Sequence, residues 1–267
     1  KSRTVQERNQ DHFTVGLVGY TNAGKSTLFN TLTEGGAYAD DRVFATLMTR
    51  TRAWHIGSGI EAMLSDTVGF VRDLPHNLIA SFRATLEEAT HADLLLVVLD
   101  VSDPAAEMQE RTVRETLDGL FDEMEKREGG AFTPPKRMLV LNKADRLDNN
   151  AQLLVWQRKH PASIPVCSLP GEDGEPGMGQ AALAAAVMDF AVGEPAEALV
   201  SIRLTHSKLM HEVETRSDVR DRKYASDSVE LHVIAGVRML ERWSRRGADV
   251  RHHVTGEAMF APEQPAW

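Results

Sequence analysis

Residues 19–26, GYTNAGKS, constrain this chain more than any other stretch, because they fit the pattern G-x-x-x-x-G-K-[ST] of a phosphate-binding loop. They follow the apolar, β-branched run 13–19 and precede a helical stretch around residues 26–32. In this context glycines let backbone N–H groups turn toward phosphates, and the helix directs its positive end at them. We predict that Lys25 reaches the β- and γ-phosphates and that the Ser26 hydroxyl ligates Mg²⁺. A glycine-rich turn that binds nothing is the alternative interpretation.

A second motif, NKAD, selects the base. The motif begins at Asn142, the last residue of the run RMLVLN (137–142), which reads as a buried strand, and it continues with Lys143 and Asp145. Doubly wound sheets bind ligands at the carboxyl ends of their strands. The carboxylate of Asp145 can accept hydrogen bonds from N1–H and the 2-amino group of guanine, whereas adenine offers neither donor. The motif therefore predicts GTP and GDP as ligands.

A third motif, D-x-x-G, lies between the other two and comprises Asp66, Thr67, Val68 and Gly69. An acidic residue at a strand end can hold Mg²⁺ through water, and Gly69 lets its backbone N–H approach a γ-phosphate. Thr46, in a threonine-rich stretch before this motif, is the candidate for a second hydroxyl ligand to Mg²⁺.

The predicted site also includes Cys167, Ser168 and Leu169, which lie where a loop should brace the guanine ring. The predicted catalytic residues are Lys25, Thr46 and Gly69. The predicted metal ligands are Ser26, Thr46 and, through water, Asp66. The predicted nucleotide-binding residues are Gly19, Tyr20, Thr21, Asn22, Ala23, Gly24, Lys25, Ser26, Thr27, Asp66, Thr67, Val68, Gly69, Asn142, Lys143, Asp145, Cys167, Ser168 and Leu169.

Strand and helix patterns alternate over the first 190 residues, which predicts an α/β fold: a doubly wound P-loop domain with a mainly parallel sheet. The strongest strand signal is ADLLLVVLDV (92–101), which is apolar throughout, as in a strand covered on both faces. The other expected strands are 13–19, 51–56, 60–65, 137–142 and 163–168. The expected helices are 26–32, 78–89, a long one that begins at Asp103-Pro104 and ends at Gly129-Gly130, and 180–190; residues 35–49 are expected to form a loop.

The domain organisation is predicted as a linker over 1–12, a GTP-binding domain over 13–192 and a small α+β domain over 199–260. The stretch GEPAEA (193–198) is expected to link the two domains. The expected strands of the small domain are 200–204 and 228–234, and its expected helices are 207–215 and 235–245.

Charge and composition limit the classes of binding partner and the cellular compartment that we expect for this protein. Of the net charge of −9, residues 1–200 carry −10, residues 201–253 carry +3 and residues 254–267 carry −2; residues 201–253 also hold five histidines. The basic part either has an ordinary solvated surface or faces a polyanion such as RNA. The single cysteine, Cys167, excludes an internal disulfide and a cysteine zinc site. With no secretory signal pattern and no apolar run near the ~20 residues of a membrane span, we expect a cytoplasmic protein, by default a monomer.

Three stretches together resemble the HflX family of GTPases: VGYTNAGKSTLFNTL (18–32), VFATL (43–47) and DTVGFVRDLPHNLIASFRATLEE (66–88). The resemblance covers about residues 13–190. It implies a GTPase that binds the large ribosomal subunit and acts in freeing or splitting stalled ribosomes. HflX-type proteins normally carry an N-terminal domain before the GTP-binding domain, and only twelve polar residues precede it here. The family more often shows Ser-Ala where Leu169 follows Ser168, and an LDPTTR-like string where LMTRTR stands.

The residue after Gly69 is Phe70, whereas many GTPases place there a glutamine that orients the attacking water. We therefore predict slow intrinsic hydrolysis that a partner or a bound ion accelerates. Asn22 resembles the asparagine through which some GTPases use K⁺, although a local turn hydrogen bond explains that residue type equally well. Arg72 is either an internal arginine finger or an ordinary solvated side chain. Two other functions remain open: a slow GTP-dependent adaptor switch, and a GTPase of tRNA modification or ribosome assembly.

Overall fold

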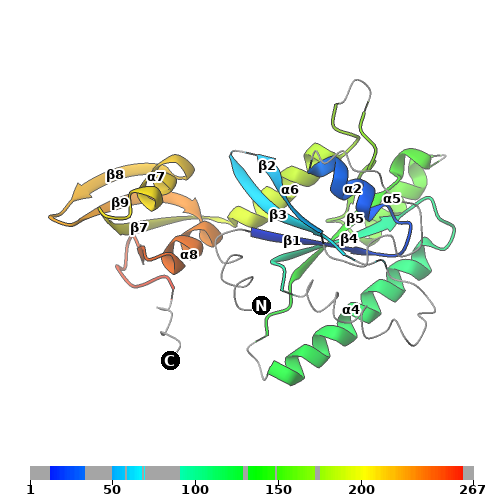
Figure 1. The fold of residues 1–267 in the computed structure, drawn as a ribbon, viewed down its shortest axis with the longest axis horizontal. Coiled ribbons are helices and arrows are strands. Elements are labelled where there is room, and N and C mark those ends of the chain that lie inside the picture. The colour runs from blue at the N-terminus through cyan, green and yellow to red at the C-terminus, as the bar shows by residue number, and fades with distance from the viewer. Residues whose placement is uncertain are drawn as a thin grey trace. The chain divides into compact units, whose positions relative to one another are not determined.

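The computed structural model describes residues 13–33, 50–57, 59–67, 69, 91–128, 132–147, 149–171 and 175–260. By its internal contacts the chain divides into two compact units, residues 1–185 and 186–267, and the division falls inside helix α6 (Gln180–Val192). Each unit has a sheet of its own (Figure 1). The expected loop over 35–49 and the expected helix over 78–89 lie outside the described residues.

The first unit is built on a six-stranded sheet with the strand order β2-β3-β1-β4-β5-β6. All neighbouring strands in it are parallel except β2 and β3, which form an antiparallel hairpin. The predicted doubly wound fold with a mainly parallel sheet is therefore confirmed. The strands are β1 (Phe13–Gly19), β2 (Arg50–Gly57), β3 (Ile60–Asp66), β4 (Leu94–Asp100), β5 (Lys136–Asn142) and β6 (Ile164–Pro165).

Strand β4 is the centre of this sheet because its sequence, LLLVVLD, has apolar side chains for both faces. On one face, Leu95 packs with Val18 and with the apolar stripe of α4 (Ala106–Glu128). Nearer the end of the strand, Leu99 packs with Trp156 of α5 (Asn150–Lys159). Helix α2 (Lys25–Leu32) lies on the side of the sheet opposite α4 (Figure 1).

Helix α5 is absent from the sequence prediction, since its sequence NAQLLVWQRK has no apolar stripe of helical period. Trp156 is buried, whereas Leu154 and Val155 are 58% and 62% exposed. The start of the helix is stabilised by its N-cap: the Asn149 side chain accepts hydrogen bonds from the N–H groups of Ala151 and Gln152.

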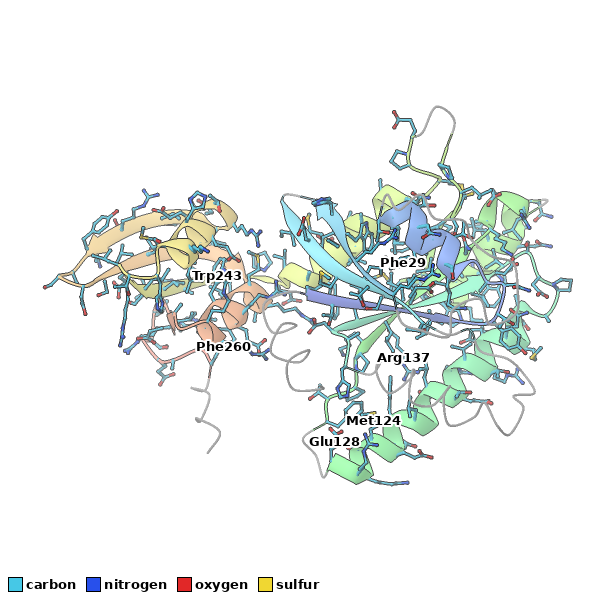
Figure 2. All side chains as sticks on the ribbon, viewed as in Figure 1. Phe29, Met124, Glu128, Arg137, Trp243 and Phe260 are labelled. Atoms are coloured by element: carbon cyan, nitrogen blue, oxygen red, sulfur yellow. The ribbon has the colours of Figure 1, made fainter. Side chains whose placement is uncertain are left out.

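The second unit is a four-stranded antiparallel sheet with the order β10-β7-β9-β8, accompanied by two helices. Its core gathers alternate residues of β7 and β9 around the fully buried Trp243 (Figure 2). This arrangement confirms the predicted small α+β fold. The elements are β7 (Pro195–Arg203), α7 (Ser207–Arg216), β8 (Asp218–Tyr224), β9 (Ser228–Gly236), α8 (Val237–Arg245) and β10 (Asp249–His252).

The predicted linker over 193–198 is wrong from Pro195 onward, because Pro195–Ala198 pair with Val233–Gly236 as the start of β7. The proline occupies the first position of the strand, where a missing N–H is tolerated. Buried and less buried residues alternate along β7 from Ala198, which is fully buried. The glutamates near Ala198 interrupt the apolar pattern, so this alternation was not recognised in the sequence. Strand β8, DVRDRKY, was also missed, because it is an exposed edge strand whose charged side chains carry no apolar pattern.

Among the described residues, no helix is both long enough and apolar enough to cross a membrane.

Candidate functional site

The predicted site residues meet where the parallel strands end. Asp100, the last residue of β4, stands opposite Asn142, the last residue of β5. Gly19 at the end of β1 pairs with Val98 of β4, and Asp66 ends β3 beside β1. Because parallel strands share a direction, the residues that follow each of them converge on the same edge of the sheet.

The phosphate loop runs from the end of β1 to α2, which begins at Lys25. Its glycines are required by close approach: a Cβ on Gly19 would overlap the Val98 carbonyl oxygen, and one on Gly24 would overlap the Asn142 side-chain amide. Gly24 also has a φ of +95°, which favours glycine. The loop is therefore wedged between β4 and the NKAD motif.

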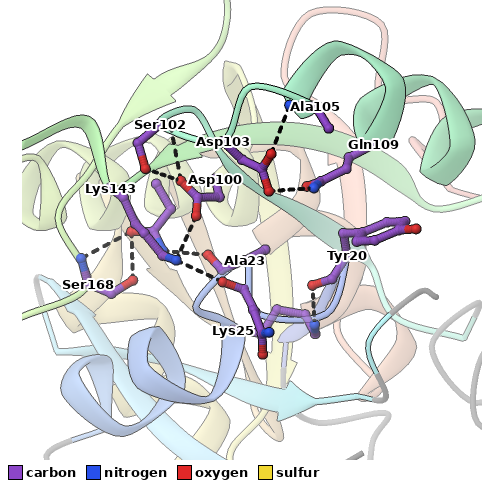
Figure 3. Close-up of polar contacts among 12 residues, drawn as sticks. Tyr20, Ala23, Lys25, Asp100, Ser102, Asp103, Ala105, Gln109, Lys143 and Ser168 are labelled. Atoms are coloured by element: carbon purple, nitrogen blue, oxygen red, sulfur yellow. Dashed lines mark hydrogen bonds and ion pairs between the residues drawn. The ribbon is translucent and has the colours of Figure 1, made fainter. Parts of the chain in front are cut away.

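Lys25 is buried within this loop, with 6% of its surface exposed. Its Nζ donates a hydrogen bond to the Gly19 carbonyl oxygen at 3.1 Å. It also donates to the Tyr20 carbonyl oxygen at 2.9 Å (Figure 3). Burial lowers the pKa of Lys25 to about 8, and the negative charge of Asp66 opposes that shift. The loop thus holds the ammonium group in place through backbone oxygens, at the position where the sequence predicts phosphate binding.

Gly69 lies against this loop, since a Cβ added to it would come within 2.8 Å of Lys25 Nζ and 2.9 Å of the Thr21 side chain. This close approach suits the predicted role of its backbone N–H beside a γ-phosphate. Thr67 uses its side chain differently, because its buried hydroxyl donates to the Leu17 carbonyl of β1 at 2.6 Å. That bond fixes the start of the D-x-x-G motif to the sheet.

Ser26 and Asp66 form the candidate magnesium site. The Ser26 hydroxyl donates to Asp66 Oδ2 at 2.7 Å, and Asp66 is fully buried. Mg²⁺ prefers oxygen ligands and keeps several waters, so one hydroxyl and one carboxylate beside a phosphate suit it. Within the described part of the chain, no group of three or more His, Cys, Asp and Glu side chains is arranged to hold a metal. Four residues of the sequence hypothesis lie outside the described residues: Thr46, Val68, Phe70 and Arg72.

Asn142 fastens the base-binding loops to the phosphate loop. Its Nδ2 donates to the Ala23 carbonyl at 2.7 Å, and its Oδ1 accepts from the Ser168 N–H at 3.1 Å and hydroxyl at 2.7 Å. All of these groups are buried, so each bond replaces one that water would otherwise make. The Ser168 carbonyl in turn accepts from Thr31 of α2 at 2.7 Å.

Lys143 makes a second connection between the motifs (Figure 3). Its Nζ donates to the Asn22 carbonyl at 2.9 Å and forms an ion pair with Asp100 Oδ2 at 2.6 Å. Asn22 and Lys143 both adopt left-handed backbone conformations, with φ of 61° and 57°. Asparagine tolerates that conformation better than most residues, which is a structural reason for Asn22 in this loop.

Asp100 belongs to the site, although sequence reasoning did not select it. It also accepts hydrogen bonds from the Ser102 hydroxyl at 2.6 Å and the Ser102 N–H at 3.0 Å. Burial raises the pKa of Asp100, but hydrogen bonds from Lys143 and Ser102 lower it more, so that it lies below its usual range. The available signal was its position as an acidic residue at the end of an apolar strand, like Asp66.

The third loop carries Cys167, Ser168 and Leu169, and it faces Asp145. Gln180 Nε2 holds the loop by donating to the carbonyls of Cys167 at 2.8 Å and Leu169 at 3.3 Å. Burial raises the pKa of the Cys167 thiol, and the neighbouring Asp145 carboxylate raises it further. Asp145 itself is exposed on a short 3₁₀ turn (Ala144–Arg146), so its carboxylate is open to a ligand.

Comparison with known proteins finds the same pattern. Residues 14–143 match the family model described as 50S ribosome-binding GTPase. A GTPase HflX from Magnetococcus marinus is 48% identical over 164 residues, which cover 61% of this chain and 35% of that protein. A GTPase HflX from Escherichia coli is 46% identical over 136 residues, which cover 51% of this chain and 30% of that protein. The matched part thus spans about a third of the length of these relatives.

Among solved structures, a GTP-binding protein from Sulfolobus solfataricus in complex with GDP is 30% identical. That match has a TM-score of 0.40 and covers 62% of this chain and 50% of the other.

Proposed function

Since this chain belongs to the HflX family of GTPases, we propose that it binds GTP and hydrolyses it to GDP and phosphate. One observation carries the proposal: the base-selecting loop is bonded directly to the phosphate loop. Lys143 donates to the Asn22 carbonyl and Asn142 donates to the Ala23 carbonyl. These bonds fix the separation of the two loops, which suits a ligand with a base and a phosphate chain, such as GTP.

Guanine recognition is assigned to Asp145, whose exposed carboxylate would accept the N1–H and 2-amino donors. The Asp145→Asn variant is expected to lose GTP affinity and gain affinity for xanthosine triphosphate, whose 2-oxo group prefers a donor. A site built on such paired hydrogen bonds discriminates against a base without these donors, because the Asp145 carboxylate then lacks its partners. Equal GTP affinity of this variant and the parent in a fluorescent-nucleotide titration would contradict the assignment.

For hydrolysis, Ser26 would ligate Mg²⁺ directly and Asp66 would hold it through water. Mg²⁺ would neutralise charge on the β- and γ-phosphate oxygens. Lys25 stabilises the same phosphates with its ammonium group, and the Gly69 N–H is the candidate donor to the γ-phosphate. Phe70 cannot orient the attacking water, so slow turnover without a partner is part of the proposal. Asn22 remains the candidate for a K⁺ requirement, and equal rates in K⁺ and Na⁺ buffers would remove it.

The partner we propose is the large ribosomal subunit, with ribosome splitting or rescue in the cytoplasm as the cellular role. Two observations support this proposal: the matching family model is described as ribosome-binding, and residues 201–253 carry a net positive charge suited to RNA. We propose that the chain acts as a monomer.

The deciding experiment measures GTP turnover in K⁺ buffer, with and without purified large ribosomal subunits. Without subunits we expect roughly 10⁻⁴ to 10⁻² per second, as for other unassisted GTPases. Strong stimulation, lost in Lys25→Ala, would support the ribosomal role. Tight GTP binding without stimulation would instead favour an adaptor switch, or a GTPase of tRNA modification or ribosome assembly.

A further inference from the structure

A second pocket, of about 280 Å³, opens in the first unit away from the predicted nucleotide-binding residues. It lies over β4 and β5, beside α4 and the residue that follows α5. Its apolar floor is formed by Val97, Leu117 and Leu139; Val97 and Leu139 stand opposite each other in the sheet. No residue of the predicted GTP site lines it.

The polar wall of this pocket carries both signs of charge. Glu110, Arg114 and Asp118 are four residues apart, so they form one line along α4, and Arg137 comes from β5 (Figure 2). Arg137 Nη2 contacts Asp118 Oδ1 at 2.6 Å, and its guanidinium lies over the Phe121 ring at 5.1 Å. These contacts orient the guanidinium, which has five N–H donors in all.

In the other ion pair of the wall, the two side chains differ in solvent exposure. Arg114 Nε lies 3.4 Å from Glu110 Oε1, and the Arg114 side chain is 56% exposed, whereas that of Glu110 is 8% exposed. Because the Arg114 side chain is largely solvated, its attraction for the buried Glu110 carboxylate is weakened. A second positive group in the pocket would therefore stabilise Glu110.

His160 supplies a further polar group to the lining. Its ring is stacked on Trp156 with centroids 5.9 Å apart, which fixes its orientation. Its Nε2 is buried and has no hydrogen-bond partner among the described residues. Because this nitrogen has no accessible surface, a ligand in the pocket contacts His160 through its other atoms.

We propose that this pocket binds a small zwitterion with an apolar body, the chemistry of a free apolar amino acid. Its carboxylate accepts hydrogen bonds from Arg137, its ammonium pairs with Glu110, and its apolar part covers the floor. The two ion pairs of the wall cancel in charge, so the pocket has no surplus positive charge to hold a dianion such as phosphate.

The test titrates L-leucine into the full chain and follows amide shifts by NMR together with calorimetry. For a ligand of this size we expect a Kd of about 1 mM. Two analogues dissect the recognition: 4-methylpentanoate lacks the ammonium, and 3-methylbutylamine lacks the carboxylate. Each is expected to bind at least about tenfold more weakly, and inorganic phosphate is expected not to compete.

The variant Arg137→Met should weaken leucine binding at least about tenfold. The matched variant Arg111→Met, on an exposed position of α4 outside the pocket, should leave it unchanged. GDP affinity should be the same in both variants, which checks folding and keeps this proposal separate from the GTPase proposal. Absence of saturable shifts, or equal affinity for leucine and 4-methylpentanoate, would overturn it.

Discussion

At the residue scale, the two lysines of the proposed nucleotide site have different electrostatic environments. Lys25 is buried and bonded to neutral carbonyl oxygens, so burial lowers its pKa to about 8. Lys143 is only partly buried and pairs with the carboxylate of Asp100. If Lys25 binds phosphate as we propose, its charge lacks a full counterion until the phosphate binds, whereas Lys143 already pairs with Asp100.

Lys25 predicts a pH dependence of GDP binding. Below pH 8 it is protonated in the free protein. Above that pH it loses its proton, and bound phosphates favour the charged form, so binding must then take up a proton. The Kd should rise as pH increases from about 7.5 to about 8.8, by at most about tenfold per pH unit. Calorimetry in two buffers of different ionisation enthalpy measures the uptake.

Lys25→Ala is the control for this pH dependence. Any ionisation of the guanine base affects GDP binding to the parent and to the variant alike, so only the contribution of Lys25 differs. Its weaker affinity should stay nearly constant over the same pH range. A parent Kd that does not change, or an equal slope in the variant, would contradict the role of Lys25.

From the ion pair between Asp100 and Lys143 we predict that substitution of Asp100 lowers the affinity for nucleotide. The change Asp100→Asn removes the charge that holds Lys143 against the Asn22 carbonyl. Hydrogen bonds to charged groups contribute about 1.5–3 kcal/mol, so GDP should bind at least about tenfold more weakly.

Asp103→Asn is the matched control for Asp100, since Asp103 accepts from Ala105 and Gln109 at the start of α4 and not from Lys143. It should lower stability with little effect on GDP affinity. If both variants bound GDP equally well, Lys143 would not need its counterion.

At the scale of elements, each unit depends on a contact between segments that are distant in the chain. In the first unit, β1, β3, β4 and β5 end at one edge and deliver their following residues to one place. In the second unit, Glu212 of α7 accepts from Arg246 at 2.6 Å, beyond the end of α8, and from Trp243 Nε1 at 3.4 Å. The same carboxylate also bonds to Arg216 at 3.2 Å.

From the contacts of Glu212 we predict that this residue makes a pH-dependent contribution to the stability of the second unit. Burial raises the pKa of Glu212, but contacts with Arg246, Arg216 and Trp243 lower it more, so the pKa lies below its usual value. The stabilisation is therefore present above the unfolded pKa of roughly 4.3 and is lost as pH falls through the folded value.

The corresponding variant is Glu212→Gln. At pH 7 it should reduce the free energy of unfolding of the second unit by about 1–3 kcal/mol, and the difference should shrink below about pH 4. Urea unfolding followed at the two pH values measures it. Glu241→Gln, which removes an exposed pair with Arg245, is the control and should change stability by less than about 0.5 kcal/mol. A deficit that is the same at both pH values would contradict the ionic role.

At the scale of the whole molecule, each of the two units packs its described apolar residues against its own sheet. The first is centred on β1, β4 and β5, and the second on the antiparallel sheet around Trp243. Because the nucleotide site draws its described residues from the first unit alone, damage to the second core should leave nucleotide binding intact.

Trp243→Ala tests this independence. Truncation of a fully buried tryptophan costs about 3–5 kcal/mol, so the second unit should unfold at lower temperature, with faster amide exchange in β7 and β9. GDP affinity should change less than about twofold, because unfolding there removes no site residue. Trp156→Ala, in the first unit, is the matched control and should destabilise the GDP-binding unit instead. Loss of GDP binding in Trp243→Ala would show that the units do not fold independently.

Local sequence determined the parts of this protein whose physics is local. The pattern of glycines, lysine and serine between a strand and a helix predicted a phosphate-binding loop. Uninterrupted apolar runs predicted strands buried on both faces. Elements without a local apolar pattern were missed. The edge strand β8 is stabilised by its pairing with β9, α5 by its cap and one buried tryptophan, and the start of β7 by burial of Ala198.

The tertiary structure alone decided how the motifs are joined. Nothing in the sequence indicates that Asp100 is the counterion of Lys143, or that Asn142 bonds to both Ala23 and Ser168. These pairs are separated by 26 to 119 residues and meet only because parallel strands end at a common edge. The residue types in a motif follow from the chemistry of the ligand. Their mutual contacts follow from strand order and register, which are set by burial over the entire sheet.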